Sequence, residues 1–288
     1  LAFGKGFNSE VSLTTLESLP VSAESMSVNS SSQPFRVLPV GKTYPPHSSL
    51  RFNMHDIRGN DALTPLVTED YLNIVDPEIR GKLQLPALRL MWMNVWNSPL
   101  LDALNIRYVL FPVDRLDAPP TGLKPIRTSG GVHIFENSAA LDRAFFVHKW
   151  IGYQNSSQVL ERLKRQDLDL RKTALLAGVT SAEQSLPVNF DERIIFREYS
   201  DHLIRLSATC AASGLLVLSD TFFPGWEVYV DGQQTECLQV NHMMRGVFLE
   251  PGEHKVEFRY NPVSFRLGLF ISLAGVLLFI LCILINIR

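Results

Sequence analysis

The chain has 288 residues and a formal net charge of −2 at neutral pH. Its basic residues are scattered, so it lacks the concentrated basic surface that binding to nucleic acid requires. The length is enough for one to three domains with a sizeable core.

The first 34 residues are rich in Ser, Thr and Glu, and we expect an irregular approach segment there. Residues 35–185 then alternate between strand-like and helical spacing of apolar residues, which predicts an α/β domain. Strands are expected at 35–40, 106–111, 123–127, 132–135 and 144–147, and helices between 61 and 104 and from Ser156 or Ser157 onward. The Gly130-Gly131 pair between two of these strands predicts a hairpin.

One polar cluster in this region is a candidate binding site. His55, Asp56, Arg58 and Asp61 place an imidazole, two carboxylates and a guanidinium within seven residues. Such a set is suited to holding a phosphate or the hydroxyls of a sugar, since Arg offers a planar fork of donors. The alternative is a structural turn in which Asp56 pairs with Arg58 and Asp61 caps a helix.

Residues 186–263 follow a different pattern, with short strand-like runs between turns, which predicts a β-sandwich. The runs are 188–199, 202–208, 214–218, 226–230, 236–240, 246–249 and 255–260. Asp231-Gly232 predicts a tight hairpin turn. Alternation in 226–230 puts Trp226, Val228 and Val230 on one face, which predicts a core position for Trp226; the alternative is a ring on which a sugar stacks.

The stretch 267–285 contains no charged residue and lies between Arg266 and Arg288. A helix of this length, at about 1.5 Å per residue, is roughly 28 Å long, which matches the hydrocarbon core of a bilayer. We therefore predict a transmembrane helix over 265–287, with the lipid bilayer as partner; the alternative is a buried core helix. Together these segments give a mixed α+β fold class. Flanking charges say little about orientation, because large domains cross membranes largely regardless of charge.

Known motifs assign no enzyme class to the chain. Gly41-Lys42-Thr43 is not a phosphate-binding loop, because Arg36 stands where the first glycine is required and Pro45-Pro46 prevents a helix from starting. The sequence has no zinc-ligand spacing, no nucleophile elbow and no dinucleotide fingerprint. It therefore predicts no metal, no cofactor and no catalytic residue.

The cysteines give information on the redox compartment of the chain, and its first residue on whether it is part of a longer protein. Cys210 and Cys237 fall in the same predicted sandwich and are able to pair in an oxidising compartment, so both the paired and the free state stay open. Cys282 lies in the predicted membrane helix. The chain begins with Leu1 and shows no signal-sequence pattern, so we expect the C-terminal part of a longer protein.

Two stretches carry a family resemblance. Residues 216–232 read Leu-Val-Leu-Ser-Asp-Thr-Phe-Phe-Pro-Gly-Trp-Glu-Val-Tyr-Val-Asp-Gly, and residues 245–258 read Arg-Gly-Val-Phe-Leu-Glu-Pro-Gly-Glu-His-Lys-Val-Glu-Phe. This block, followed by a final membrane helix, resembles the C-terminal signature of YfhO-type bacterial membrane proteins. Looser likeness at 35–38, 56–61, 106–110 and 167–173 extends the resemblance over most of residues 35–288.

YfhO-type proteins are similar to the multi-spanning GT-C glycosyltransferases, which use sugars linked to polyprenyl phosphate and carry an acidic catalytic loop among N-terminal membrane helices. The resemblance implies an extracytoplasmic body on the outer side of a bacterial plasma membrane. Its implied partners are N-terminal membrane helices of the same polypeptide and a lipid-linked sugar or envelope glycan. Since this chain has one span, no catalytic residue carries over, and we expect it to be inactive alone. The alternative is a non-enzymatic, membrane-tethered β-sandwich that binds glycan or a partner protein.

Overall fold

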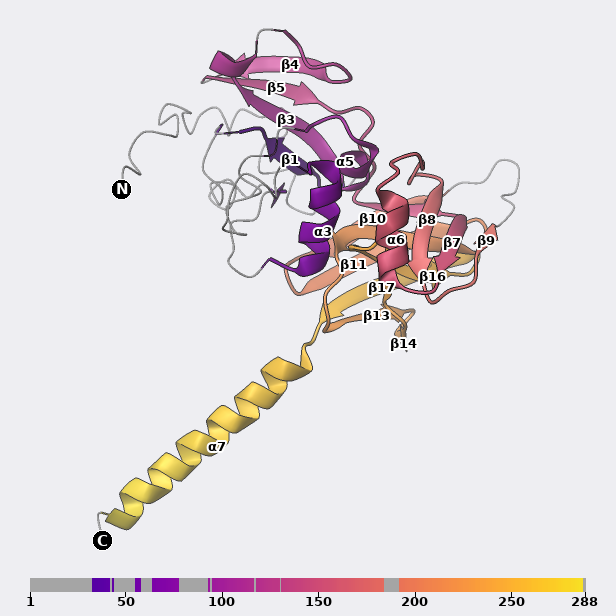
Figure 1. Ribbon diagram of the computed structural model, residues 1–288. Coiled ribbons are helices and arrows are strands. Elements are labelled where there is room, and N and C mark those ends of the chain that lie inside the picture. The colour runs from indigo at the N-terminus through magenta and orange to yellow at the C-terminus, as the bar shows by residue number, and fades with distance from the viewer. Residues whose placement is uncertain are drawn as a thin grey trace.

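A computed structural model describes residues 33–41, 43, 55–57, 64–77, 93, 95–116, 118–129, 131–183 and 192–286. In this part of the chain, three β-sheets form the body, and one long C-terminal helix projects away from it (Figure 1). The predicted mixed α+β class with a C-terminal helix is confirmed.

The first sheet brings the N-terminal strands together. Its order is β2 (His55–Asp56), β1 (Arg36–Pro39), β3 (Ile106–Pro112), β5 (Val132–Glu136) and β4 (Lys124–Ser129). β1 runs parallel to both of its neighbours, whereas β5 is antiparallel to β3 and β4. The β4–β5 hairpin forms where the glycine pair predicts it, and Gly131 takes a φ of +77°, which glycine adopts without steric cost.

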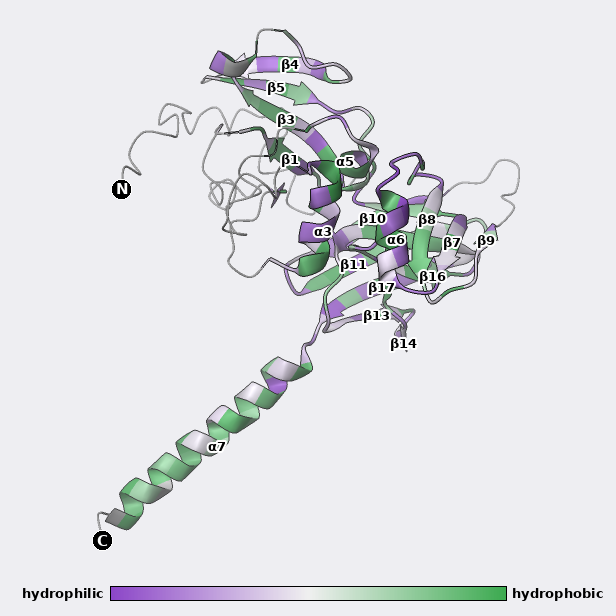
Figure 2. Ribbon diagram, viewed as in Figure 1, coloured by the Kyte–Doolittle hydropathy of each residue, from purple (hydrophilic) through white to green (hydrophobic). Residues whose placement is uncertain are grey.

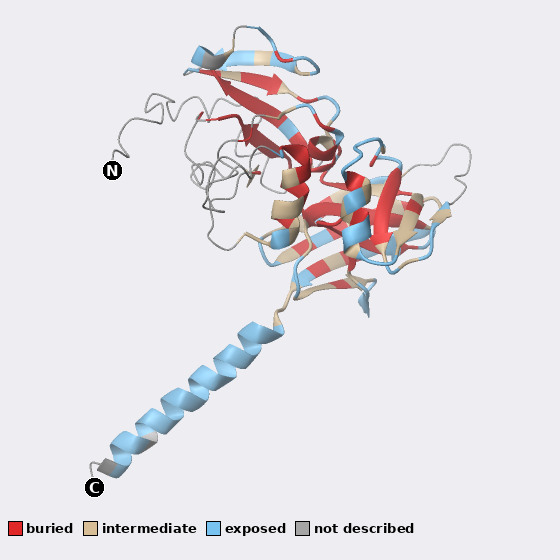
Figure 3. Cartoon of the chain, in the orientation of Figure 1, coloured by how far each residue is buried: buried red, intermediate tan, exposed pale blue. Residues whose placement is uncertain are grey.

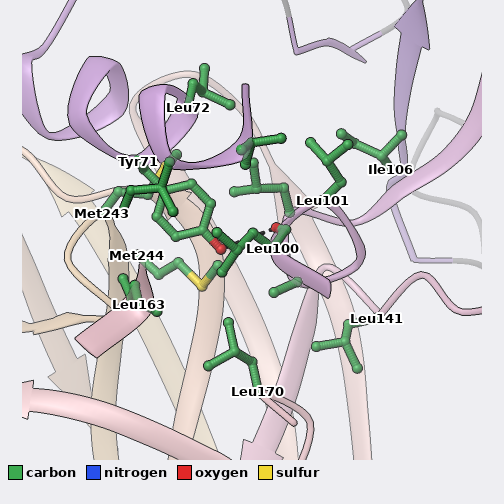
Figure 4. Packing of buried hydrophobic residues seen from close by; sticks show 14 of the residues in the cluster. Tyr71, Leu72, Leu100, Leu101, Ile106, Leu141, Leu163, Leu170, Met243 and Met244 are labelled. Atoms are coloured by element: carbon green, nitrogen blue, oxygen red, sulfur yellow. Dashed lines mark hydrogen bonds between the residues drawn. The ribbon is translucent and has the colours of Figure 1, made fainter. Parts of the chain in front are cut away.

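The described residues include three short helices, α3 (Leu66–Val75), α5 (Pro99–Ala103) and α6 (Ser156–Leu163). α5 contacts β3 of this sheet, whereas α6 contacts α3 and, in another sheet, the strands at 149–153 and 173–177. α5 begins at Pro99, which suits the first position of a helix, and the Ser98 side chain caps it by accepting a hydrogen bond from Leu100 N. α6 begins at Ser156, as predicted, and Asn155 caps it, since the Asn155 side chain accepts a hydrogen bond from Gln158 N. Tyr71 of α3 lies fully buried among leucines from several segments and donates to the Leu100 carbonyl at 3.0 Å (Figure 4).

The other two sheets form a sandwich. One has the order β6 (Ala144–Val147), β12 (Gly214–Thr221), β16 (Met244–Leu249), β15 (Leu238–Val240), β8 (Thr173–Ala177), β7 (Lys149–Tyr153), β9 (Ala182–Glu183). The other has the order β10 (Arg193–Tyr199), β11 (Leu203–Cys210), β17 (Gly252–Tyr260), β13 (Trp226–Val230), β14 (Gln233–Thr235). Buried residues of both sheets, such as Leu206, Leu218 and Phe258, share one core.

The sandwich is antiparallel except for the parallel pair β7–β8. β6 to β9 precede residue 186 and yet lie in one sheet with β12, β15 and β16. The predicted division of the soluble body at residue 185 stays a prediction, and strands from both sides of it share that sheet. The Asp231-Gly232 turn joins β13 to β14 as predicted, with φ of 51° and 84°, and Val230 pairs with Gln233.

α7 (Val263–Asn286) is the projecting C-terminal helix, starting two residues before the predicted span. It is apolar on all sides and its described side chains are exposed (Figures 2 and 3). The alternative of a buried core helix is therefore wrong. Residues 263–285 are long and apolar enough to cross a membrane, and so large an apolar surface is stable only in lipid or against a partner.

Cys210 and Cys237 do not form a disulfide, and both are free thiols. Burial raises the pKa of Cys210 and that of Cys237 to about 11, so both are protonated at neutral pH.

Candidate functional site

A cavity of about 370 Å³ lies where the three sheets meet. Its walls come from β1 and β2 of the first sheet, from β12 and β16 of the second, and from β10, β11, β13 and β17 of the third. The lining residues are Arg36, His55, Pro65, Tyr199, Ser200, Asp201, Ile204, Asp220, Thr221, Phe223, Trp226, Arg245 and Tyr260.

The cavity is next to the start of α7. Tyr260 ends β17 three residues before α7, and its ring lies 5.3 Å from that of Trp226. The turn before Trp226 packs on the same junction, because Asn261 N donates to the Gly225 carbonyl at 2.7 Å. Gly225 has a φ of +106°, and a Cβ there would lie 3.0 Å from Pro262. Only glycine fits this turn without strain, which accounts for the Pro-Gly-Trp sequence.

One buried carboxylate binds three buried guanidiniums beside the cavity. Asp220 Oδ1 lies 3.1 Å from Arg36 Nη2 and 2.7 Å from Arg143 Nη2, and Asp220 Oδ2 lies 3.1 Å from Arg245 Nη2. The Tyr199 hydroxyl donates to both carboxylate oxygens at 3.2 Å and accepts a hydrogen bond from Arg143. We call Arg36, Arg143, Asp220 and Arg245 the arginine cluster.

Burial and mutual attraction shift the pKa values of the groups in the arginine cluster. Burial alone would raise the pKa of Asp220, but the three guanidiniums hold it well below its usual range. Burial and the neighbouring Arg143 lower the pKa of Arg36 to about 10. Burial also lowers the pKa of Arg245, whereas at Arg143 burial is outweighed by the combined attraction of Asp220 and Tyr199, which raises the pKa. Since a guanidinium stays protonated in proteins, all four groups are ionised at neutral pH.

The two cavity-lining arginines of the cluster are held differently. Arg36 Nη1 donates to the carbonyls of Leu104 and Ser219 at 2.8 Å and 2.7 Å, which ties the first sheet to β12. The guanidinium carbon of Arg245 lies 3.7 Å from the centre of the Trp226 ring, within cation–π range. Among the described residues, Nε and Nη1 of Arg245 have no hydrogen-bond partner, and the same holds for Nε and Nη1 of Arg143.

His55 stands in the cavity wall next to these charges. Its ring meets that of Tyr199 edge to face, with centroids 5.4 Å apart. Burial, together with the positive charges of Arg143 and Arg36, lowers the pKa of His55 to about 4, so the imidazole is neutral at neutral pH.

Two of the predicted site residues, His55 and Trp226, line this cavity together. Asp56 follows His55 in β2 and pairs with Val37, and it does not line the cavity. Arg58 and Asp61 lie outside the described residues. Trp226 is half-buried, with its ring against both the sandwich core and the cavity, so the two alternatives for it are not exclusive.

The sequence analysis missed the arginine cluster. Each member interrupts or borders a run of apolar residues: Arg36 in 35–38, Arg143 before 144–147, Asp220 after 215–218, and Arg245 in 243–249. A charge inside an apolar strand is rare because burying it is costly unless it is paired, so these interruptions were the available signal.

Two other kinds of site, a metal site and a Ser-His-Asp triad, were considered among the described residues. Within the described residues no set of three His, Cys, Asp or Glu side chains is arranged to hold a metal ion. Ser156 Oγ lies 2.8 Å from His242 Nδ1, and His242 Nε2 lies 3.5 Å from Asp70 Oδ2. The second separation is too long for the hydrogen bond that orients a catalytic histidine, and none of the three residues lines the cavity.

Comparison with known proteins gives one match. Residues 191–272 match the family model described as bacterial membrane protein YfhO. No curated protein and no solved structure matches the chain. The matched segment contains β10 to β17 and the start of α7, and with them Tyr199, Asp220, Trp226 and Arg245 of the cavity. Residues 191–272 are therefore similar to the bacterial membrane protein YfhO family, in agreement with the resemblance predicted from the sequence.

Proposed function

We propose that the chain is the C-terminal, extracytoplasmic region of a multi-spanning protein that transfers a sugar from polyprenyl phosphate to a bacterial cell-envelope glycan. N-terminal membrane helices of the same polypeptide carry the acidic catalytic loop, and the body described above binds the lipid-linked sugar or the acceptor. The family match supports the membrane protein. The resemblance of the family to GT-C enzymes supports sugar transfer and an outer-side location.

The position and lining of the cavity are the observation that carries this proposal. The cavity lies beside the strand that leads into α7. With α7 in the bilayer, as proposed, this position is near the membrane surface, where a lipid-linked substrate presents its head, and it supports the proposal. Phe223, Trp226 and Tyr260 offer aromatic faces, and Ser200 and Asp201 offer polar groups. Ligand sites combine apolar walls with a few placed polar groups in this way.

In this proposal His55 and Trp226 contact the ligand, and Trp226 supplies the face on which a sugar ring stacks. Asp56, Arg58 and Asp61 continue the chain from His55 and remain candidates for binding sugar hydroxyls. The chain alone is expected to be inactive, because the catalytic loop belongs to the membrane helices.

The proposal is tested in the bacterium, with the full-length gene and a quantitative analysis of envelope sugars. We expect deletion of the gene to remove one sugar from the envelope, and Trp226→Ala to lower that sugar by about threefold to tenfold, since an aromatic contact contributes about 0.5–1.5 kcal/mol. Tyr229→Ala is the matched control, because Tyr229 lies on the same strand and does not line the cavity.

An unchanged envelope in the deletion strain would contradict sugar transfer. The non-enzymatic module would then be the better account, and binding of the purified chain to envelope glycan would be its test.

A further inference from the structure

The arginine cluster carries more positive charge than its own carboxylate neutralises. Arg36, Arg143 and Arg245 all contact Asp220, so three positive charges face one negative charge and an excess of two remains. The side chains of Arg143 and Arg245 are both 3% exposed, so water does not screen this excess well.

Two of the three arginines line the cavity. Arg36 and Arg245 form part of its wall, and Nε and Nη1 of the buried Arg245 have no hydrogen-bond partner among the described residues. His55, the remaining basic group of the wall, is neutral at neutral pH and adds no charge. The second carboxylate of the lining, Asp201, is exposed, where solvent screens it, whereas Asp220 is already bound by the three arginines.

We propose that this end of the cavity is a binding site for a phosphate group, held by Arg245 and Arg36 with Arg143 behind them. A phosphate monoester carries up to two negative charges and several acceptor oxygens, which match the excess of two charges and the free guanidinium donors. The cavity, about 370 Å³, leaves room for the group that the phosphate carries.

The phosphate can arrive from two sources with the same chemistry. The site is beside the junction with α7, so a lipid headgroup is one source, and a soluble phosphate ester is the other. The site shares its cavity with the proposed function and names the group by which the cavity would recognise a ligand. The test of the phosphate site uses phosphate without any sugar. A negative result would therefore overturn the phosphate site and leave sugar transfer standing, and an unchanged envelope in the deletion strain would overturn sugar transfer and leave the phosphate site standing.

The experiment measures phosphate binding by the full chain in nanodiscs of phosphatidylcholine. The thermal midpoint is followed by tryptophan fluorescence while sodium phosphate replaces sodium chloride at constant ionic strength. A ligand that binds the folded state raises the midpoint in a saturable way. We expect such a rise with phosphate, and an equal midpoint in phosphate and chloride would overturn the proposal.

Variants assign the effect to the cluster. Arg245→Gln should weaken phosphate binding by about tenfold or more, the loss expected for a charge-assisted hydrogen bond. Arg259→Gln is the matched control, because Arg259 is half-exposed on β17 and does not line the cavity, and it should bind like the wild type. Equal binding by the two variants would overturn the site.

Asp220→Asn keeps the test decisive if Arg245→Gln does not fold. Removing the competing carboxylate raises the excess to three charges, so this variant should melt lower in chloride and gain more from phosphate than the wild type. A smaller gain than that of the wild type would contradict the proposal.

Two further titrations identify the source. Glycerol 3-phosphate is added to the same nanodiscs, and separate nanodiscs contain phosphatidic acid. A rise with glycerol 3-phosphate indicates a site open to soluble esters, and a rise with phosphatidic acid alone indicates a lipid headgroup. Either rise supports the proposal when Arg245→Gln shifts it to at least about tenfold higher ligand concentration, and a rise that Arg245→Gln leaves unchanged counts against it.

Discussion

The guanidinium of Arg245 lies 3.7 Å from the ring centre of Trp226, and the two residues belong to opposite sheets of the sandwich. Arg245 also contacts Asp220, so the aromatic wall of the cavity and its charged wall form one continuous contact. A change at Trp226 therefore affects both the stability of the sandwich and the position of a cluster arginine.

Trp226→Ala is expected to lower the free energy of unfolding by about 2 kcal/mol, because it removes a half-buried ring and its cation–π contact. Trp226→Phe keeps an aromatic face and should cost less than about 1 kcal/mol. Chemical denaturation of the full chain in a zwitterionic detergent measures both. Equal costs for the two variants would show that the aromatic face is not what stabilises Arg245.

Asp220→Asn is expected to cost about 3 kcal/mol or more, because three buried guanidiniums lose their shared counter-charge. Glu257→Gln provides the contrast. Glu257 pairs with the half-exposed Arg205 and Arg259, and exposed pairs contribute at most about 1 kcal/mol. If the two substitutions cost the same, Asp220 does not hold the three sheets together.

The His55 imidazole predicts a specific pH dependence. Its pKa is about 4 in the folded chain against 6.5 for an ordinary histidine, so between these values the unfolded chain binds more protons. Stability is therefore fully present above pH 6.5 and falls as the pH drops from 6.5 to 4, by at most about 3 kcal/mol. His55→Gln should flatten this fall. Parallel stability curves for the wild type and the variant in that pH range would refute the assignment.

Gly246 is expected to resist substitution because the two strands around it leave no room. A Cβ there would lie 2.5 Å from Val240 Cγ2 and 3.1 Å from the Leu216 carbonyl. Gly246→Ala should cost about 1–3 kcal/mol, as overpacking typically does. Gly268→Ala in α7 is the control, since nothing lies within 4 Å of its added Cβ, and thermal unfolding of the soluble body should not change. A wild-type midpoint for Gly246→Ala would show that β15 and β16 are packed less closely than described.

Arg58→Ala tests the polar cluster of the sequence analysis. In the full-length protein it should lower sugar transfer more than it lowers the amount of folded protein, because the proposal assigns Arg58 to ligand binding. Envelope-sugar analysis and immunoblotting of the same cells measure the two effects. An equal loss of both would favour the alternative of a structural turn.

Local patterns predicted most strands of the sandwich beyond residue 192 and their turns, whereas β7, β8, β9 and β14 were not predicted. Asp231-Gly232 forms a tight turn because glycine and aspartate tolerate positive φ, a property readable from two adjacent residues. α7 was equally readable, since its length and uniform apolarity depend on no other segment.

Pairing between distant segments could not be read in the same way. β6 to β9 join the sheet of β12, and the apolar spacing of a strand does not specify which strand lies beside it. The arginine cluster has the same origin: Arg36 and Arg245 are far apart in the sequence, and only the fold brings them to one carboxylate. The sequence shows that charged residues interrupt apolar runs, but it does not show that these residues contact one another in the folded chain.

The most direct test of the account is the behaviour of α7 in membranes. Membranes that contain the full chain are washed with alkaline carbonate, alongside membranes from cells that express residues 1–262. The account predicts that the full chain stays with the membranes until detergent is added and that residues 1–262 are released. Release of the intact full chain by carbonate would contradict the membrane span, and with it the position of the cavity at the bilayer surface.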